Sequence, residues 1–168
     1  MVINHGIEQT VLEEALSAAS EFFRLPKEEK KKLMSKDVKK PVRENMGKYA
    51  IEVRKFALKI MGSITESLGI GPTYLSTKLE EGMQVMAVNC YLLLVPEIKG
   101  ALQVHLGDHF EVLSNGMYRS VVHRATLQRD TTRYSIASLH SLGMDEKMEI
   151  AKELMDQGLP KGYRESSF

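Results

Sequence analysis

Residues Gly107–Leu139 read GDHFEVLSNGMYRSVVHRATLQRDTTRYSIASL, and this stretch decides the fold. Ser120–Leu127 and Arg133–Leu139 alternate between apolar and polar residues and are rich in Val, Ile, Thr and Tyr, as half-buried strands are. The polar residues 128–132 between them are typical of a turn. Before them, Asn115-Gly116 suits a tight turn that needs positive φ. The pattern therefore predicts a pair of strands that form a hairpin.

The hairpin also carries most of the residues that could do chemistry. His123 lies on its first strand, whereas Arg133 and Ser135 share one face of the second, because side chains repeat every second residue. We expect Ile136 and Val122 to be core residues of the paired strands. An imidazole can move protons near neutral pH, and a guanidinium suits bidentate binding of a carboxylate. The stretch therefore predicts a candidate site for proton transfer beside an anion.

The N-terminal part of the chain has helical periodicity. Apolar residues recur at helical spacing over residues 8–23 and again over residues 44–68. Leu25-Pro26 ends the first helix, because a proline disfavours the α region in the residue before it, and Pro26 opens a second helix. Gly69 is placed to end the long helix. Residues 1–81 are therefore predicted to be mainly helical, with a short helix over 73–81.

The rest of the chain completes one α+β domain over residues 1–168. Residues 82–140 are predicted to hold the strands, beginning with the nearly continuous apolar run of 84–95. Residues 141–168 are predicted to form a C-terminal helix over 144–156, with Asp145 as its cap, and a loop-like tail. The turn at Gly107 is followed by Asp108 and Glu111, and a short helix there would make Asp108 a cap.

Composition limits the classes of partner. The chain of 168 residues has a net charge of +1, which favours no polyanionic partner, so we expect no nucleic acid. No apolar run approaches the roughly 20 residues of a membrane span, so we expect no membrane partner. The single cysteine, Cys90, lies in an apolar strand and is expected to be buried and inert. One cysteine excludes an internal disulfide and fits a reducing compartment, so a cytoplasmic location is expected.

Four segments of the sequence together resemble the plant 2-oxoglutarate- and Fe(II)-dependent dioxygenases, and most of all their DMR6-like and flavanone 3-hydroxylase-like members. The segments are Asn4-His5-Gly6-Ile7, the phrase EFFRLPKEEKKKL, Asn89-Cys90-Tyr91, and the stretch that opens this section. The resemblance implies a shortened, incomplete double-stranded β-helix, a jelly-roll or cupin-like fold, with flanking N-terminal helices. It covers nearly the whole chain as blocks joined across gaps.

The resemblance also implies roles for particular residues. In the family, the position of His123 supplies the last histidine of an iron site made of two histidines and one carboxylate. The Arg-x-Ser formed by Arg133 and Ser135 would hold the distal carboxylate of 2-oxoglutarate. Asn89 and Tyr91 match an Asn-x-Tyr that also contacts this cosubstrate. His5 is not a metal ligand in the family, and a turn residue is expected there.

The sequence departs from the family at the iron site. The family's first histidine and carboxylate come from a His-x-Asp motif, and no His-x-Asp occurs in this sequence. The intervening block of barrel strands is absent as well. Because three protein ligands must converge on one metal, we expect iron and 2-oxoglutarate both to be lost, leaving no cofactor and His123 as a remnant third ligand.

These observations lead to a hypothesis for function. The chain would be a redox-neutral enzyme, an isomerase, epimerase or cyclase, that acts on a small plant specialised metabolite by acid–base chemistry. His123 would transfer the proton, with Tyr91 or Tyr134 as partner and Arg133 as the anion anchor. Two alternatives stay open: a non-catalytic binding or regulatory remnant, and an Fe(II)/2-oxoglutarate oxygenase with a rebuilt site. Missing strands would leave unpaired edges, so a homodimer is expected.

Overall fold

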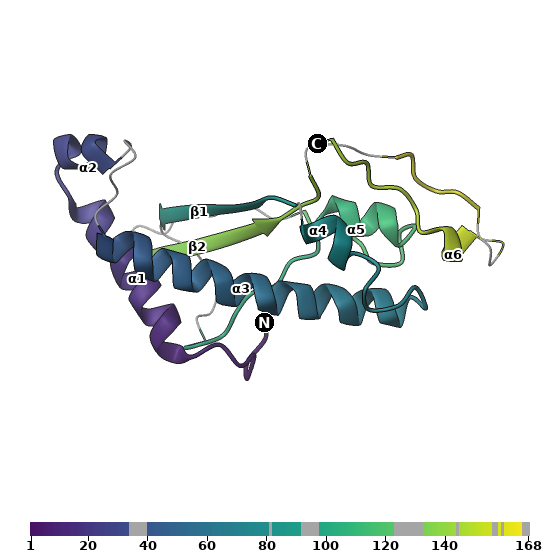
Figure 1. The fold of residues 1–168 in the computed structure, drawn as a ribbon, viewed down its shortest axis with the longest axis horizontal. Coiled ribbons are helices and arrows are strands. Elements are labelled where there is room, and N and C mark those ends of the chain that lie inside the picture. The colour runs from purple at the N-terminus through teal and green to yellow at the C-terminus, as the bar shows by residue number, and fades with distance from the viewer. Residues whose placement is uncertain are drawn as a thin grey trace. The chain divides into compact units, whose positions relative to one another are not determined.

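The computed structural model describes residues 1–33, 40–80, 82–91, 98–122, 133–143, 145–155, 158 and 160–165. The chain forms two compact units (Figure 1). Unit 1 comprises Met1–Phe56, Val85–Leu102 and Arg124–Leu139, and unit 2 comprises Ala57–Gln84, Gln103–His123 and His140–Phe168. The single-domain organisation expected from the sequence stays a prediction.

The first two helices are separated at Leu25-Pro26, as the sequence predicts. Helix α1 spans Gln9–Arg24 and helix α2 spans Lys27–Leu33. Leu25 between them is extended, with φ −61° and ψ 145°, and its N–H donates to the carbonyl of Phe22 over 3.2 Å. The ring of Pro26 imposes this conformation on Leu25, because it clashes with an α-helical residue before it. The predicted break is therefore confirmed.

Helix α3 spans Lys40–Ser67 and ends by a local backbone motif. Gly69 has φ +74°, and its N–H donates to the carbonyl of Glu66 over 2.9 Å. The N–H of Ile70 donates to the carbonyl of Thr65 over 3.0 Å. These two bonds form a Schellman motif, which a glycine in the left-handed region allows. The predicted termination at Gly69 is confirmed, and the short helix α4, Ser76–Glu80, follows.

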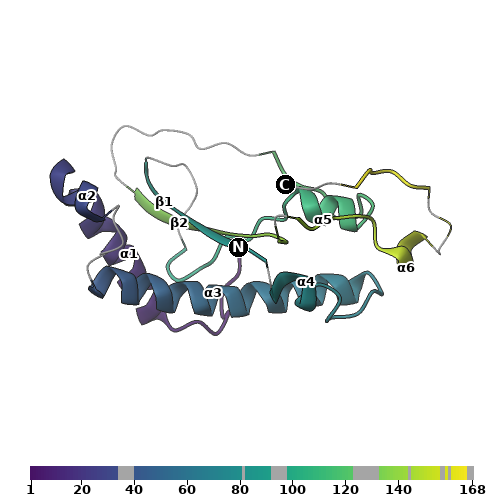
Figure 2. The ribbon, with the colours of Figure 1, turned by 45° about the horizontal axis from the view of Figure 1, so that its top comes forward.

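The sheet of unit 1 consists of two strands, β1 (Gln84–Tyr91) and β2 (Arg133–His140), in the described part of the chain. Figures 1 and 2 show them side by side. The strands are antiparallel, since the N–H of Ser141, just after β2, donates to the carbonyl of Met83, just before β1, over 3.0 Å. The second predicted strand of the hairpin is confirmed. Most of the first lies in residues 123–132, outside the described residues.

Each unit has its own apolar core. In unit 1, helices α1 and α3 contribute buried Leu12, Ala15, Tyr49 and Val53, and Ile136 of β2 packs against this cluster. The Tyr49 hydroxyl lies 3.5 Å from the Ile136 carbonyl. Helices therefore cover one face of the sheet. The prediction of a packed Ile136 agrees with this cluster.

The core of unit 2 gathers residues from several short segments. Its buried members are Leu68, Leu75, Leu79, Phe110, Val112, Leu113, Leu142, Met148, Ile150, Ala151 and Leu154. Helix α5 (Asp108–Leu113) supplies three of these side chains. The short helix predicted after Gly107 is confirmed, but its cap residue is Gly107 and Asp108 is the first helical residue. Asn115 (φ 51°) and Gly116 (φ 83°) follow in the left-handed region that the predicted turn requires.

The predicted helix over 144–156 is wrong in extent. Helix α6 spans only Lys152–Met155, and Asp145 does not cap it. Met148 and Ile150, two positions apart, are both buried, as in an extended segment. The N–H of Ala151 donates to the carbonyl of Leu113 over 3.1 Å. Packing against α5 therefore outweighs the helical preference of these residues.

Two predictions about burial are also wrong. Val122 is fully exposed, at 102% of its reference area, and residues 119–122 are not in a strand. The alternation rule applies to strands, and the described residues 119–122 are not in one. Cys90 is exposed rather than buried. Cys90 lies one residue before the end of β1. The apolar sequence of the strand predicts burial, but it does not show how much of the strand the helices cover.

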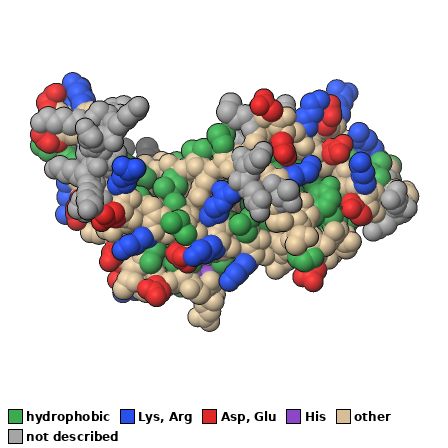
Figure 3. Space-filling view, in the orientation of Figure 1, with side chains coloured by type: hydrophobic (Ala, Val, Ile, Leu, Met, Phe, Trp, Pro, Cys, Tyr) green, Lys and Arg blue, Asp and Glu red, His purple; other side chains and the backbone are tan. Residues whose placement is uncertain are grey.

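The surface mixes both signs of charge. On the face drawn in Figure 3, Lys and Arg side chains lie among Asp and Glu side chains, consistent with a net charge of +1. Ion pairs such as Lys55–Glu52 and Lys31–Glu28 join neighbours on exposed helix surfaces. None of the described helices has both the length and the apolar character to span a membrane.

Candidate functional site: the sheet face with Arg133

Side-chain alternation sorts the candidate residues onto the two faces of the sheet. Ile136 of β2 and Met86 of β1 pack against the helices of unit 1. Residues at odd positions point to the other face, because side chains alternate along a strand. Asn89, Arg133 and Ser135 therefore share the face away from α1 and α3. The structure brings together the three residues that the resemblance assigns to the cosubstrate and that lie in the described strands.

The register of the sheet sets which of these residues are neighbours. The bond from the Ser141 N–H to the Met83 carbonyl makes these two residues a directly opposed pair. Extending this register without a bulge places Ser135 opposite Asn89. Opposed residues have Cβ atoms about 4.5–5.5 Å apart, so the Ser135 hydroxyl and the Asn89 carboxamide are within reach of one small ligand. The Asn89 Nδ2 donates to the carbonyl of Ala87 over 3.4 Å.

The side chain of Arg133 contains a buried hydrogen-bond donor. Its Nη1 atom is buried and has no hydrogen-bond partner in the described part of the chain. A buried donor without an acceptor costs about 1–3 kcal/mol, and more when it is charged. Proteins rarely leave such a group unpaired. The guanidinium is therefore suited to an anion from outside the described residues, and a carboxylate matches its planar geometry.

Tyr134 lies on the opposite face from Arg133. Its ring stacks on the ring of Phe23 of α1, with centroids 5.9 Å apart and an interplanar angle of 30°. This contact gives Tyr134 a packing role on the helix side of the sheet. Tyr91 is the last residue of β1, and its side chain lies outside the described part. His123 also lies outside the described residues.

The described residues do not fit a three-ligand iron site. Among them, no group of three His, Cys, Asp or Glu side chains is placed to hold a metal ion. His123 is not among them, and the sequence contains no His-x-Asp. The described residues do fit a carboxylate of 2-oxoglutarate, since the buried Nη1 of Arg133 has no partner among them.

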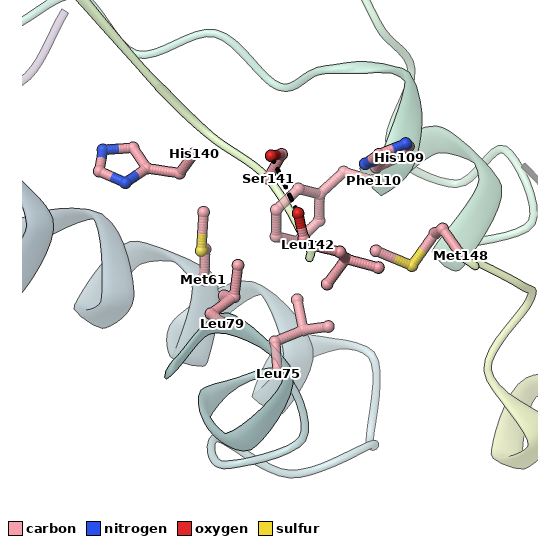
Figure 4. A pocket seen from close by; sticks show the side chains of 9 residues that line it. All are labelled: Met61, Leu75, Leu79, His109, Phe110, His140, Ser141, Leu142 and Met148. Atoms are coloured by element: carbon pink, nitrogen blue, oxygen red, sulfur yellow. Dashed lines mark hydrogen bonds between the residues drawn. The ribbon is translucent and has the colours of Figure 1, made fainter. Parts of the chain in front are cut away.

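Unit 2 contains a small apolar cavity of about 30 Å³ (Figure 4). Figure 4 shows His109 of α5 and His140 of β2 on either side of its apolar side chains in this view. Its lining residues are Met61, Leu75, Leu79, His109, Phe110, His140, Ser141, Leu142 and Met148. About 10–15 Å³ of such volume holds one water molecule. The cavity is therefore too small for 2-oxoglutarate or an aromatic substrate, and it is a packing feature.

The sequence analysis missed a polar cluster around Glu111. One carboxylate oxygen accepts the hydroxyl of Tyr163 over 2.7 Å, and the other accepts the N–H of Ser120 over 2.7 Å. The Tyr163 hydroxyl and then the Ser120 N–H lower the pKa of Glu111 below its usual value. The same contact raises the pKa of Tyr163. Glu111 gave no periodic signal in the sequence, because its partners lie 9 and 52 positions away.

Comparison with known protein families matches two profiles along the chain. Residues 60–141 match the 2OG-Fe(II) oxygenase superfamily. Residues 1–72 match the N-terminal region described as "non-haem dioxygenase in morphine synthesis". The two matches overlap over residues 60–72, from the last turns of helix α3 onward, so helices and strands both carry the resemblance.

Similar curated proteins come from plants. "Flavanone 3-dioxygenase 3" of Oryza sativa subsp. japonica is 37% identical, with 99% of this chain and 75% of the relative covered. "2-oxoglutarate-dependent dioxygenase 21, chloroplastic" of the same organism is 36% identical, with 99% of this chain and 74% of the relative covered. The first alignment runs over 245 positions, whereas this chain has 168 residues, so the alignment includes segments of the relative that this chain lacks.

A solved structure shows the fold. The structure of JOX2 in complex with 2OG, Fe and JA matches with a TM-score of 0.81 at 20% identity, covering 99% of this chain and 74% of that chain. The expected fold, a shortened and incomplete jelly roll with flanking N-terminal helices, is confirmed by this match. The short antiparallel sheet of β1 and β2 is the described part of that jelly roll.

The comparisons overturn one prediction and confirm another. The expectation that iron and 2-oxoglutarate are lost is wrong, because the superfamily that the chain matches is described by both cofactors. A broken sequence motif is not sufficient ground for the loss of a cofactor. The resemblance read from the four sequence segments is confirmed, and the chain belongs to the 2OG-Fe(II) oxygenase superfamily.

Proposed function

We propose that this chain binds 2-oxoglutarate on the face of its sheet away from α1 and α3 and acts as a 2-oxoglutarate-dependent dioxygenase on a plant specialised metabolite. The observation that carries the proposal is the buried Nη1 atom of Arg133, which has no partner among the described residues. A carboxylate bound there would supply the missing acceptor. An Arg–carboxylate pair with two parallel hydrogen bonds is among the stronger contacts available to a protein.

Each residue of the face has a proposed task. Arg133 would bind the distal carboxylate of 2-oxoglutarate, and the Ser135 hydroxyl would donate to the same group. Asn89, on the neighbouring strand, would contact the other end of the molecule through its carboxamide. In a dioxygenase His123 would be an iron ligand, as the resemblance implies, whereas proton transfer by His123 with Tyr91 or Tyr134 belongs to the redox-neutral alternative. The chemistry that 2-oxoglutarate would supply when bound is oxidative decarboxylation by O2 to succinate and CO2, with the second oxygen atom passing to the substrate.

The proposed substrate class follows from the names of the relatives. One of them is a flavanone 3-dioxygenase, and another of the similar proteins is named "Oxoglutarate-dependent flavonoid 7-O-demethylase 1", from Ocimum basilicum. A planar phenolic molecule is therefore the first compound to try. The exposed apolar side chains Val85 and Leu139 lie on the same face as Arg133 and would suit an aromatic ring.

Calorimetric titration with 2-oxoglutarate tests the binding step. We expect Arg133→Gln to weaken binding at least about tenfold, because a charge-assisted hydrogen bond is worth about 1.5–3 kcal/mol. Arg24→Gln, at the exposed end of α1, is the matched control and should bind like the unaltered chain. Equal affinity in all three proteins would remove Arg133 from the site.

A second experiment separates the possible reactions. The chain is incubated with a flavanone, Fe(II), ascorbate and 2-oxoglutarate, with and without oxygen, and succinate and product are measured. Succinate formed only with oxygen supports the dioxygenase. Product formed equally without oxygen would instead support the redox-neutral isomerase, epimerase or cyclase expected from the missing His-x-Asp. Tight 2-oxoglutarate binding without any product would support the non-catalytic regulatory protein.

We also propose that the chain forms a homodimer by pairing sheet edges, which leaves the face with Arg133 available for a ligand. In the described part of the chain, β1 and β2 form a two-stranded sheet, so each strand has an edge that a second copy could cover. Light scattering coupled to gel filtration should give twice the monomer mass, and a monomer at all concentrations would contradict this. A cytoplasmic location is likewise a proposal that fluorescence microscopy can test.

A further inference from the structure

The C-terminal segment, defined here as residues 160–165, is bound to the end of helix α5 through one asparagine side chain. The Nδ2 of Asn115 donates to the carbonyl of Pro160 over 3.0 Å, and its Oδ1 accepts the N–H of Gly162 over 2.9 Å. The carboxamide of Asn115 therefore donates to one backbone carbonyl and accepts from one backbone N–H, as a neighbouring strand would. Lys147 adds an ion pair with Glu165 at 2.7 Å.

Two glycines allow this close approach. A Cβ on Gly116 would lie 3.0 Å from the ring of Tyr163, and Gly116 also has φ +83°. A Cβ on Gly162 would lie 3.0 Å from the Oδ1 of Asn115. The aromatic ring of Tyr163 therefore lies over the turn that follows α5. The C-terminal segment is held in one orientation by backbone, aromatic and charged contacts together.

Residues 118–120, which follow the turn after α5, are also held by specific hydrogen bonds. The N–H of Tyr118 donates to the hydroxyl oxygen of the buried Ser114 over 2.9 Å. The Tyr118 hydroxyl lies 2.7 Å from the hydroxyl of Ser67 at the end of α3. The N–H of Ser120 donates to Glu111 over 2.7 Å. In the sequence, this segment leads directly into the hairpin stretch that carries Arg133.

Glu111 is the residue that joins the two segments. Its Oε1 accepts the hydroxyl of Tyr163 and its Oε2 accepts the N–H of Ser120. Two hydrogen bonds at opposite oxygens fix the plane of a carboxylate, whereas one bond leaves it free to rotate. The hydroxyl of Tyr163 therefore helps to set the orientation in which the Glu111 carboxylate accepts the N–H of Ser120.

We propose that Glu111 is a positioning residue through which the docked C-terminal segment holds residues 118–120 in place. Release of Tyr163 frees the carboxylate and so weakens its bond to Ser120. This coupling does not require 2-oxoglutarate to bind, and its test is independent of the proposed function. It assigns the C-terminal segment a role in holding residues 118–120, in addition to covering the turn after α5.

Amide hydrogen exchange at Ser120, measured on the full chain, tests the coupling. Tyr163→Phe removes one hydroxyl and keeps the ring, so the fold should persist. We expect it to speed Ser120 exchange between about 2-fold and 10-fold, the range for one hydrogen bond. Glu111→Gln should do the same, because the carboxamide is uncharged and makes a weaker bond to the Ser120 N–H than a carboxylate does. Exchange at Leu113, in the core, should stay unchanged in both variants.

Lys147→Met provides the matched control. It removes the ion pair with Glu165 and leaves Glu111, Tyr163 and Ser120 untouched. It should speed exchange in the C-terminal segment and leave Ser120 unchanged. If Tyr163→Phe leaves Ser120 exchange unaltered while Glu111→Gln raises it, the C-terminal segment is not coupled to residues 118–120. If neither variant alters it, Glu111 has no positioning role at all.

A pH series supplies a second measurement. Protonation of Glu111 removes an acceptor, so Ser120 exchange, corrected for its intrinsic rate, should speed as the pH falls below the lowered pKa of Glu111. Asp108 and Arg119 are the charged groups that also act on this carboxylate, in opposite directions. Glu111→Gln should abolish the pH dependence. An unchanged pH profile in that variant would assign the effect to another group and overturn the proposal.

Discussion

The imidazole Nε2 of His5 lies 2.8 Å from the carbonyl oxygen of Gly100, across 95 positions of sequence. The Nδ1 of the same ring accepts the N–H of Ile7 over 3.1 Å. Because Nδ1 is an acceptor, Nε2 carries the hydrogen and donates to Gly100. The ring also meets Phe56 edge-on, with centroids 5.7 Å apart. His5 is therefore a structural residue that ties the N-terminal segment of unit 1 to the Gly100 turn.

This relationship gives the first prediction. His5→Ala should lower the free energy of unfolding by about 1–3 kcal/mol, because it leaves the N–H of Ile7 and the carbonyl of Gly100 without their partners. Urea denaturation followed by circular dichroism measures the change. Lys99→Ala, which removes an exposed ion pair with Glu13 from the same turn, is the control and should change it by less than about 1 kcal/mol. Equal effects would show that the His5 contacts contribute nothing specific.

The second prediction concerns the sheet. Ile136→Ala should destabilise the chain by about 1–3 kcal/mol, since it removes apolar contacts with the core of unit 1. Val122→Ala should change the free energy of unfolding by no more than about 0.5 kcal/mol, because Val122 is fully exposed. The same denaturation assay compares the two. A loss at Val122 that matches the loss at Ile136 would contradict the exposure described for residues 119–122.

The third prediction separates backbone strain from steric contact. Gly69 and Gly116 both have positive φ, but a Cβ on Gly69 would meet nothing within 4 Å, whereas one on Gly116 would meet Tyr163. Gly69→Ala should therefore cost about 1–2 kcal/mol from strain alone. Gly116→Ala should cost more, and Tyr163→Ala in the same chain should remove the excess. Equal costs for the two glycine variants would mean that the Tyr163 ring does not rest on Gly116.

The fourth prediction is a pH dependence of the Glu111–Tyr163 contact. The pKa of Glu111 is lowered in the folded chain, so its contribution is present above the unfolded value of 4.5 and is lost as the pH falls through the folded pKa. The pKa of Tyr163 is raised, so its contribution is present below the unfolded value of 10.0 and is lost as the pH rises through the folded pKa. The contact is therefore complete between about pH 5 and 10.

Unfolding at a series of pH values tests this window. The difference in unfolding free energy between the unaltered chain and Tyr163→Phe should be largest near neutral pH and should shrink at both extremes. A difference that stays constant from pH 3 to pH 11 would show that the hydroxyl contributes through packing and not through its bond to the carboxylate. Lys147→Met, which breaks a different ion pair, should show another pH profile.

Local backbone chemistry explains why several elements could be predicted from the sequence. Pro26 forces Leu25 out of the helical region, and Gly69 adopts a left-handed conformation that other residues resist. Alternation along β2 predicts that Arg133 and Ser135 share one face. Each of these outcomes depends on residues within a few positions of one another. The matching of short segments to a family added the jelly-roll fold, which periodicity alone did not reveal.

Tertiary contacts decided the conformation of residues 148–151 and the contacts between distant segments. Residues 148–151 are extended because Met148 and Ile150 both find space in the core of unit 2 and Ala151 bonds to Leu113. The contacts of Glu111 with Tyr163, and of Asn115 with Pro160, join positions too far apart for any local pattern to show. The sequence by itself determined where helices α1 and α3 end, because both ends depend on neighbouring backbone. Only the tertiary structure decided the burial of Arg133 Nη1 and the two-sided bonding of Glu111, because these depend on which distant segments exclude water.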